Sequence, residues 1–144
     1  MKGRGSKFPP PLQCIRQFFC PPSHRGYRTL KFTVTMKRNH EFQRLYHKGK
    51  SAASPYLALY CRKSRRGQNR LGFTVGKKVG CAVKRNRVRR RLREIYRLHE
   101  HELTPGYDIV VVARVKAVYA KYAQLDKSFL SLADKLGLRK KAEG

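Results

Sequence analysis

Apolar and polar residues follow a regular pattern in most of this chain, but not in its first 35 residues. From about Met36 onward, apolar residues recur at helical or strand spacing. Residues 1–35 lack such spacing, hold five of the seven prolines and contain basic residues but no acid. This composition is typical of an extended or disordered segment. We therefore expect a basic extension over 1–35, one organised domain over 36–138 and a basic tail over 139–144.

Three stretches have the spacing of amphipathic helices, namely residues 39–49, 82–103 and 119–136. Asn39 stands where a helix N-cap is expected, and Gly49 stands where the first helix should end. In the first helix, Phe42, Leu45 and Tyr46 share one face. The predicted core faces of the other two consist of Val88, Leu92 and Ile95, then Leu125, Phe129, Leu132, Ala133 and Leu136.

Three further stretches are predicted strands, over residues 56–61, 71–75 and 107–113. The first two are joined by a basic loop, so we expect them to pair as an antiparallel hairpin with a long tip. The third is a continuous apolar run, which is typical of a buried central strand. This order of elements predicts an α+β fold, a two-layer α/β sandwich in which helices pack on a small mixed sheet.

The charge balance narrows the choice of partner. Lys and Arg number 35 against 8 Asp and Glu, which gives a formal net charge of +27. Between Phe42 and Arg93 there is no acid at all. Such a charge opposes compaction and favours a polyanionic partner. Nucleic acid is the first candidate, an anionic membrane surface the second and an acidic protein the third.

The sequence also argues against several other classes. No apolar run approaches the roughly 20 residues that span a bilayer, and no cleavable signal is present. The four cysteines form no CxxC pair, so we expect free thiols in a reducing cytoplasm, with a Cys14–Cys20 disulfide as a weaker alternative. Few acids, no HExxH spacing and no GxxxxGK[ST] motif indicate neither a metal site, a small-molecule substrate nor catalysis by protein side chains.

The strongest local signal is the basic stretch Lys84–Arg93. On a helix, Arg85, Arg89 and Arg93 form one row four residues apart, about 6 Å per step along the axis. Like charges at this spacing destabilise a helix, and an anionic partner offsets that cost. Arginine also contacts phosphate in a bidentate manner. We therefore expect this row to face an RNA or DNA backbone.

Aromatic residues supply a second candidate surface. Phe42 and Tyr46 are one helical turn apart, and Tyr60 lies on a predicted strand. If they line a groove, they can stack unpaired bases without reading sequence. The alternative is that they are core residues, and the sequence leaves this choice open.

Two neighbouring stretches together resemble the signature of the bacterial ribonuclease P protein family. The first is Phe73–Gly80, a strand that ends in a Lys-Lys loop, and the second is Ala82–Arg90, a helix that opens with Arg-Asn-Arg. Upstream, Phe42–Tyr46 followed by Lys48 and Gly49 is similar to the first helix of the family. The resemblance extends from about Met36 to Leu138.

This resemblance implies a function and a fold. Members form the protein subunit of a ribonucleoprotein endoribonuclease, a hydrolase that removes the 5′ leader of precursor tRNA. The RNA subunit performs the magnesium-dependent chemistry, and no protein catalytic residues are expected. The family fold contains a left-handed βαβ crossover, against the usual rule.

The resemblance also assigns roles to individual residues. Residues expected to contact the RNA subunit are Lys77, Lys78, Arg85, Asn86, Arg87 and Arg90. Residues expected to bind the single-stranded leader are Phe42, Tyr46, Tyr60, Arg89 and Arg93. The first 35 residues have no counterpart in the family pattern, so two readings remain: translation starts at Met36, or the extension is a basic arm that tracks RNA phosphates.

Two alternatives belong to other functional classes. A ribosomal or general RNA-binding module fits the composition equally well. A DNA-binding regulator is weaker, because specific readout needs varied polar side chains and this helix is nearly all arginine. The ordered combination of aromatic helix, Lys-Lys loop and Arg-Asn-Arg helix favours the ribonuclease P protein.

Overall fold

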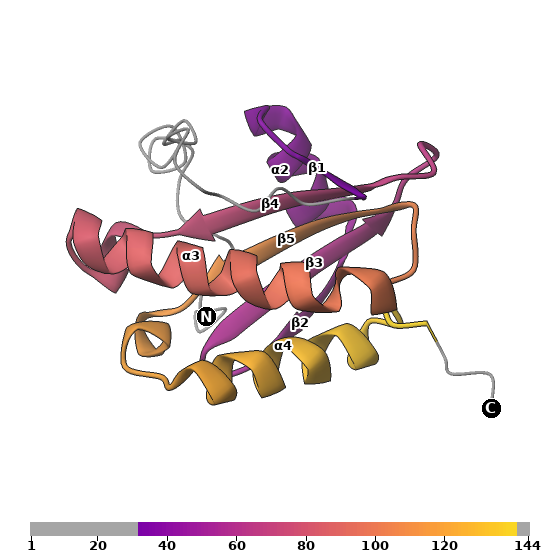
Figure 1. Cartoon of the computed structure of the whole chain (residues 1–144). Coiled ribbons are helices and arrows are strands. Elements are labelled where there is room, and N and C mark those ends of the chain that lie inside the picture. Colours follow the sequence, from indigo (N-terminus) through magenta and orange to yellow (C-terminus); the bar gives the residue numbers. More distant parts are fainter. Residues whose placement is uncertain (1–31, 141–144) are drawn as a thin grey trace, which may run out of the picture.

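A five-stranded mixed sheet organises residues 32–140, the part of the chain that this computed structural model describes. The strands are β1 (Thr33–Thr35), β2 (Lys50–Ala53), β3 (Leu57–Lys63), β4 (Asn69–Val75) and β5 (Tyr107–Ala113). Their spatial order is β1-β4-β5-β3-β2 (Figure 1). The pairs β1–β4 and β4–β5 are parallel, whereas β5–β3 and β3–β2 are antiparallel. The predicted mixed sheet is therefore confirmed, with β5 at its centre.

The predicted hairpin of β3 and β4 is wrong, because β5 lies between these two strands. The reason is the composition of β5. Ile109, Val110 and Val111 are all fully buried, so successive residues need cover on both faces of the sheet. Strand β3 buries only alternate residues, among them Leu57 and Leu59. The central position therefore goes to the strand that is apolar on both sides.

Three helices cover the sheet, α2 (Asn39–Lys48), α3 (Ala82–His99) and α4 (Tyr122–Lys135). Short 3₁₀ turns lie between the elements: η1 (Lys77–Val79), η2 (Glu100–Glu102) and η3 (Val115–Val118). Helices α3 and α4 lie on one face of the sheet and α2 lies on the other (Figure 1).

All three predicted helices are confirmed, with changes at their ends. The second stops at His99 and continues as η2, and the third starts at Tyr122 because η3 takes up the preceding residues. Asn39 is the first residue of α2 and not its cap, a position held by Arg38. Gly49 ends α2 as predicted, and a Cβ there would lie 2.4 Å from the Leu45 carbonyl oxygen.

The crossover from β4 through α3 to β5 is left-handed. Viewed with α3 in front of the sheet, as in Figure 1, both strands run to the left and β5 lies below β4. Almost all parallel crossovers have the opposite hand. The feature implied by the family resemblance is therefore present in this chain.

The sheet separates two apolar clusters. The larger packs α3 and α4 against one face, and Tyr96, Phe129 and Leu92 are among its fully buried side chains. The smaller packs α2 against the other face and contains Met36, Phe42, Leu45 and Val110. Fully burying one such side chain contributes about 1.5–3 kcal/mol, so the larger cluster supplies most of the stability.

The predicted domain boundary at residue 36 is wrong, because residues just before it belong to the sheet. Strand β1 pairs with the start of β4, and the Thr33 hydroxyl lies 3.1 Å from the buried Tyr96 hydroxyl. The Phe32 amide donates to the Glu100 carboxylate at 2.9 Å. Apolar spacing could not detect β1, since the strand has only three residues and is half exposed. The remaining predicted extension, residues 1–31, lies outside the described residues.

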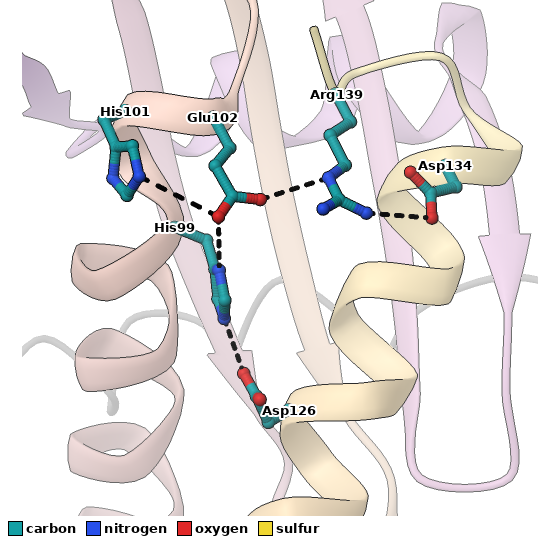
Figure 2. A network of polar contacts seen from close by, with 6 residues as sticks. All are labelled: His99, His101, Glu102, Asp126, Asp134 and Arg139. Atoms are coloured by element: carbon teal, nitrogen blue, oxygen red, sulfur yellow. Dashed lines mark hydrogen bonds and ion pairs between the residues drawn. The ribbon is translucent and has the colours of Figure 1, made fainter. Parts of the chain in front are cut away.

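A polar network joins the C-terminal residues of the domain to the ends of α3 and α4 (Figure 2). His99 at the end of α3 lies 2.7 Å from Asp126 of α4 and 3.5 Å from Glu102. Arg139 contacts Glu102 at 3.1 Å and Asp134 at 3.5 Å. The Lys140 amide also donates to the Glu102 carbonyl oxygen. Arg139 and Lys140 are therefore part of the folded domain and not of a free tail, whereas residues 141–144 lie outside the described residues.

We expect Gly72→Ala to destabilise the domain by about 1–3 kcal/mol, the usual cost of overpacking a core. A Cβ at Gly72 would lie 2.4 Å from Cε1 of Phe42, and that ring is 6% exposed with little room to move. Urea denaturation measures the effect. Gly67→Asn is the control, because Gly67 (φ 67°) lies in open space at a turn where Asn tolerates a positive φ. Equal stability of the two variants would contradict the described packing of α2.

Candidate nucleic-acid interface

The sheet face that carries α2 brings together the aromatic residues singled out from the sequence. Along a strand, alternate side chains point to the same face. Tyr60 of β3 is paired across the sheet with Val110 of β5, and Val110 with Gly72 of β4. Helix α2 lies over this row and places Phe42 and Tyr46 against it.

Phe42 and Tyr46 differ in what they can reach. Phe42 is buried, with its ring over Gly72 and beside Met36, so it is a core residue. Tyr46 packs its ring edge-on against Tyr60, with centroids 5.0 Å apart and planes at 82°. Both tyrosines are only partly buried. The Tyr46–Tyr60 pair, and not Phe42, is therefore the aromatic surface offered to solvent.

Hydrogen bonding and burial fix the protonation of this pair. The Tyr46 hydroxyl lies 2.9 Å from the Thr74 hydroxyl. Burial raises the pKa of Tyr46 to about 12, although the bond to Thr74 acts in the opposite direction. Burial also raises the pKa of Tyr60, against the nearby charge of Arg114. Both rings are thus neutral near pH 7, which suits stacking beside a polyanion.

Arg114 is a candidate that the sequence analysis missed. It follows β5 directly and lies two residues beyond Val112 and four beyond Val110. Its side chain therefore points to the same face of the sheet as theirs, the α2 face. Its guanidinium donates to the Ser54 carbonyl at 3.2 Å, and its charge acts on the Tyr60 phenol. The alternation along the strand is visible in the sequence, but the apolar run of residues 107–113 predicts only a core element.

The opposite end of the same face is closed by an ion-pair cluster. Arg70 of β4 contacts Glu41 of α2 at 2.6 Å and Asp108 of β5 at 2.9 Å. Burial alone would raise the pKa of Glu41, but the bond to Arg70 and its charge hold that pKa below the ordinary value. The cluster fixes the start of α2 to the sheet and keeps two of the few acids away from the tyrosines.

The basic helix α3 packs through Val88, Leu92, Ile95 and Tyr96 onto the sheet face opposite α2. At 100° per residue, Arg85 and Arg89 lie on the same flank as Tyr96, with Arg93 just beyond them. Because Tyr96 contacts Thr33 of β1, this flank faces the β1–β4 edge of the sheet. The predicted row of Arg85, Arg89 and Arg93 therefore runs along that edge. The α2 face lies on the other side of the sheet from this row.

Beyond the row, Arg97 forms a hydrogen-bonded ion pair with Glu94 at 3.0 Å. The first twelve residues of α3, Ala82–Arg93, contain no acid. The part of α3 that carries basic residues without any acid is therefore its N-terminal two-thirds.

The remaining predicted contacts surround the entry to α3. Turn η1 exposes Lys77 and Lys78, and the first turns of the helix expose Asn86, Arg87 and Arg90. Gly80 has a φ of 141°, which lets the chain turn from η1 into α3.

The acids of residues 32–140 are engaged elsewhere. Each of these seven carboxylates makes an intramolecular contact: Glu41, Glu94, Glu100, Glu102, Asp108, Asp126 and Asp134. Within the same residues, Lys77, Lys78, Lys84 and Arg87 take part in no ion pair. Positive charge without local neutralisation attracts a polyanion and releases its counterions on binding.

This arrangement places positive charge and partly exposed aromatic rings where a nucleic acid can bind. In the described part of the chain, no group of three His, Cys, Asp or Glu side chains could hold a metal ion. Cys61 is buried and Cys81 is exposed, and both are free thiols, whereas the considered Cys14–Cys20 pair lies outside the described residues. None of the helices in residues 32–140 has the length and apolar character needed to cross a bilayer.

Comparisons with known proteins agree with this geometry. The family model described as Ribonuclease P matches residues 30–137. The ribonuclease P protein component of Natranaerobius thermophilus is 42% identical over 108 residues, which cover 75% of this chain and 94% of the relative. That of Clostridioides difficile is 44% identical over 101 residues, covering 69% and 89%.

Solved structures give the same result. The ribonuclease P protein of Staphylococcus aureus superimposes with a TM-score of 0.69 at 31% identity, covering 74% of this chain and 98% of that one. That of Thermotoga maritima gives a TM-score of 0.63 at 29% identity, covering 76% and 98%. With family model, sequence and fold in agreement, this chain belongs to the ribonuclease P protein family.

Proposed function

We propose that this chain binds the catalytic RNA of ribonuclease P and the single-stranded 5′ leader of precursor tRNA, and so assists endonucleolytic removal of the leader. The observation that carries the proposal is the segregation of charge. Within residues 32–140, Lys77, Lys78, Lys84 and Arg87 take part in no ion pair and gather around η1 and the start of α3, while the described acids are paired elsewhere. Membership of the family makes RNA the polyanion that this surface meets.

In this proposal two surfaces bind different RNAs. The entry to α3, with Lys77, Lys78, Arg85, Asn86, Arg87 and Arg90, holds the RNA subunit through its phosphates. The Tyr46–Tyr60 pair stacks leader bases, with Arg114 beside it and with Arg89 and Arg93 at the neighbouring sheet edge. Stacking on aromatic rings accepts any base, which suits leaders of varied sequence.

The chemistry in this proposal belongs to the RNA. Magnesium in this proposal is held mainly by the RNA subunit, because phosphate oxygens are ligands that this ion prefers. The protein contributes positive charge near those phosphates, which reduces the repulsion between two polyanions brought together. No residue of the chain acts as nucleophile, acid or base, and the chain works where the RNA subunit is, which we place in the cytoplasm.

Reconstitution tests the proposal. The full chain is mixed with a bacterial ribonuclease P RNA at low magnesium, and 5′ processing of a precursor tRNA is measured. We expect cleavage to depend on both components, with none from the protein alone. Tight, salt-sensitive RNA binding without any stimulation of cleavage would instead favour a general RNA-binding module.

We expect Tyr60→Ala to weaken leader binding to the reconstituted complex by about 1–3 kcal/mol, the usual cost of losing one stacked base. Tyr60→Phe should retain binding, because the ring remains. Competition between precursor tRNA with and without a leader isolates this contribution. Phe42→Ala should behave differently and lower the stability of the fold, because Phe42 is buried. A Tyr60→Ala complex with unchanged preference for the leader would remove Tyr60 from the binding surface.

We expect the double variant Lys77→Ala, Lys78→Ala to reduce affinity for the RNA subunit and to flatten the salt dependence of binding. Each lost phosphate contact should lower the slope of log K against log salt by about 1. Binding measured over a series of salt concentrations gives this slope. Lys127→Ala, Lys135→Ala removes the same charge from exposed positions on α4 and serves as the control. Equal slopes for the two double variants would place the RNA interface elsewhere.

A further inference from the structure

The most exposed large apolar side chain of residues 32–140 is Tyr119, at 79%. It follows η3, in the connection between β5 and α4, and its neighbours Ala117 and Ala120 pack into the cluster on the sheet face that carries α3 and α4. Tyr122, at the start of α4, is 40% exposed and lies within electrostatic range of Glu94 and Arg97 on α3. With Val115, which is 46% exposed, they place three exposed large apolar side chains within residues 115–122. Apolar side chains gathered on a surface mark interaction sites, whereas a single exposed ring would not.

Positive charge surrounds this ring. Lys116 and Lys121 flank it in sequence, and both are exposed. The Arg91 guanidinium donates to the carbonyl oxygen of Ala120, the next residue, at 3.4 Å. Arg91 is thereby held beside the backbone of Tyr119. An exposed aromatic ring among cationic side chains is the combination on which single-stranded nucleic acid stacks.

The surface is continuous with the entry to α3. Turn η3 packs against η1, which carries Lys77 and Lys78, and against α3 itself. In Figure 1 the segment between β5 and α4 lies below the N-terminal end of α3. An RNA whose phosphates contact η1 and the start of α3 therefore passes beside Tyr119.

We propose that Tyr119 is a stacking site for an unpaired base of the ribonuclease P RNA subunit, with Lys116, Lys121 and Arg91 contacting the adjacent phosphates. This inference rests on the proposed function, and it adds a second aromatic surface to the one assigned to the leader. The RNA subunit is chosen over precursor tRNA because the site adjoins the η1 and α3 residues and lies on the far side of the sheet from the Tyr46–Tyr60 pair.

The test measures binding of the full chain to ribonuclease P RNA in the absence of precursor tRNA. We expect Tyr119→Ala to weaken binding roughly 5- to 150-fold, the equivalent of one lost stacking contact. The salt slope should not change, because no charge is removed. Tyr119→Trp should bind like the wild type, since it keeps a π-face. The ring is exposed, so thermal unfolding of both variants should match the wild type.

Phe32→Ala is the matched control. Phe32 is an aromatic residue that is 68% exposed, and its amide contacts Glu100 beyond the opposite end of α3. It should leave RNA binding unchanged. Wild-type affinity of Tyr119→Ala, or equal losses for Tyr119→Ala and Tyr119→Trp, would overturn the inference.

Two other results are distinguishable from these. Normal binding of Tyr119→Ala to the RNA subunit, with selective loss of precursor tRNA binding by the reconstituted complex, would transfer the site to the substrate and overturn our assignment. Failure of the wild-type chain itself to bind ribonuclease P RNA would instead overturn the proposed function, and the inference with it.

Discussion

The arrangement of this protein depends on one strand that must be buried on both faces. Ile109, Val110 and Val111 of β5 are inaccessible to solvent on either side, so both faces of the sheet need an apolar cover. Helices α3 and α4 supply it on one side and α2 on the other. The two surfaces proposed to bind RNA follow from this division, because the aromatic residues come with α2 and the arginines come with α3.

Acidic and basic residues also occupy different parts of the fold. A chain with a net charge of +27 repels itself, and its eight acids cannot neutralise 35 basic residues. The fold places most of the described acids where they connect elements. Arg70 is held between Glu41 and Asp108, and His99 lies between Glu102 and Asp126 at the junction of α3 and α4 (Figure 2). These contacts stabilise the domain and leave the entry to α3 positive, which is the arrangement a phosphate backbone requires.

The tyrosines show that residues of the same type have different roles according to how deeply they are buried. Tyr96 is fully buried and hydrogen-bonded to Thr33, and burial raises its pKa to about 12. Tyr46 and Tyr60 are half-covered and present ring surface, while Tyr119 is almost fully exposed. A single-stranded RNA can stack only on the accessible rings, those of the Tyr46–Tyr60 pair and of Tyr119. Since these lie on different sides of the sheet, our proposals give the leader and the RNA subunit separate aromatic contacts.

The sequence by itself determined the three helices, the central position of β5, the α+β class and the concentration of charge in Lys84–Arg93, because each depends on local spacing or composition. It could not determine which strands are neighbours. The expected pairing of β3 with β4 failed, since burial of β5 on both faces is a property of the whole sheet. Strand β1 was missed because three half-exposed residues carry no periodic signal, and only pairing with β4 reveals them. Whether Phe42 is core or surface was likewise decided by Gly72, thirty residues away, whose missing side chain leaves room for that ring.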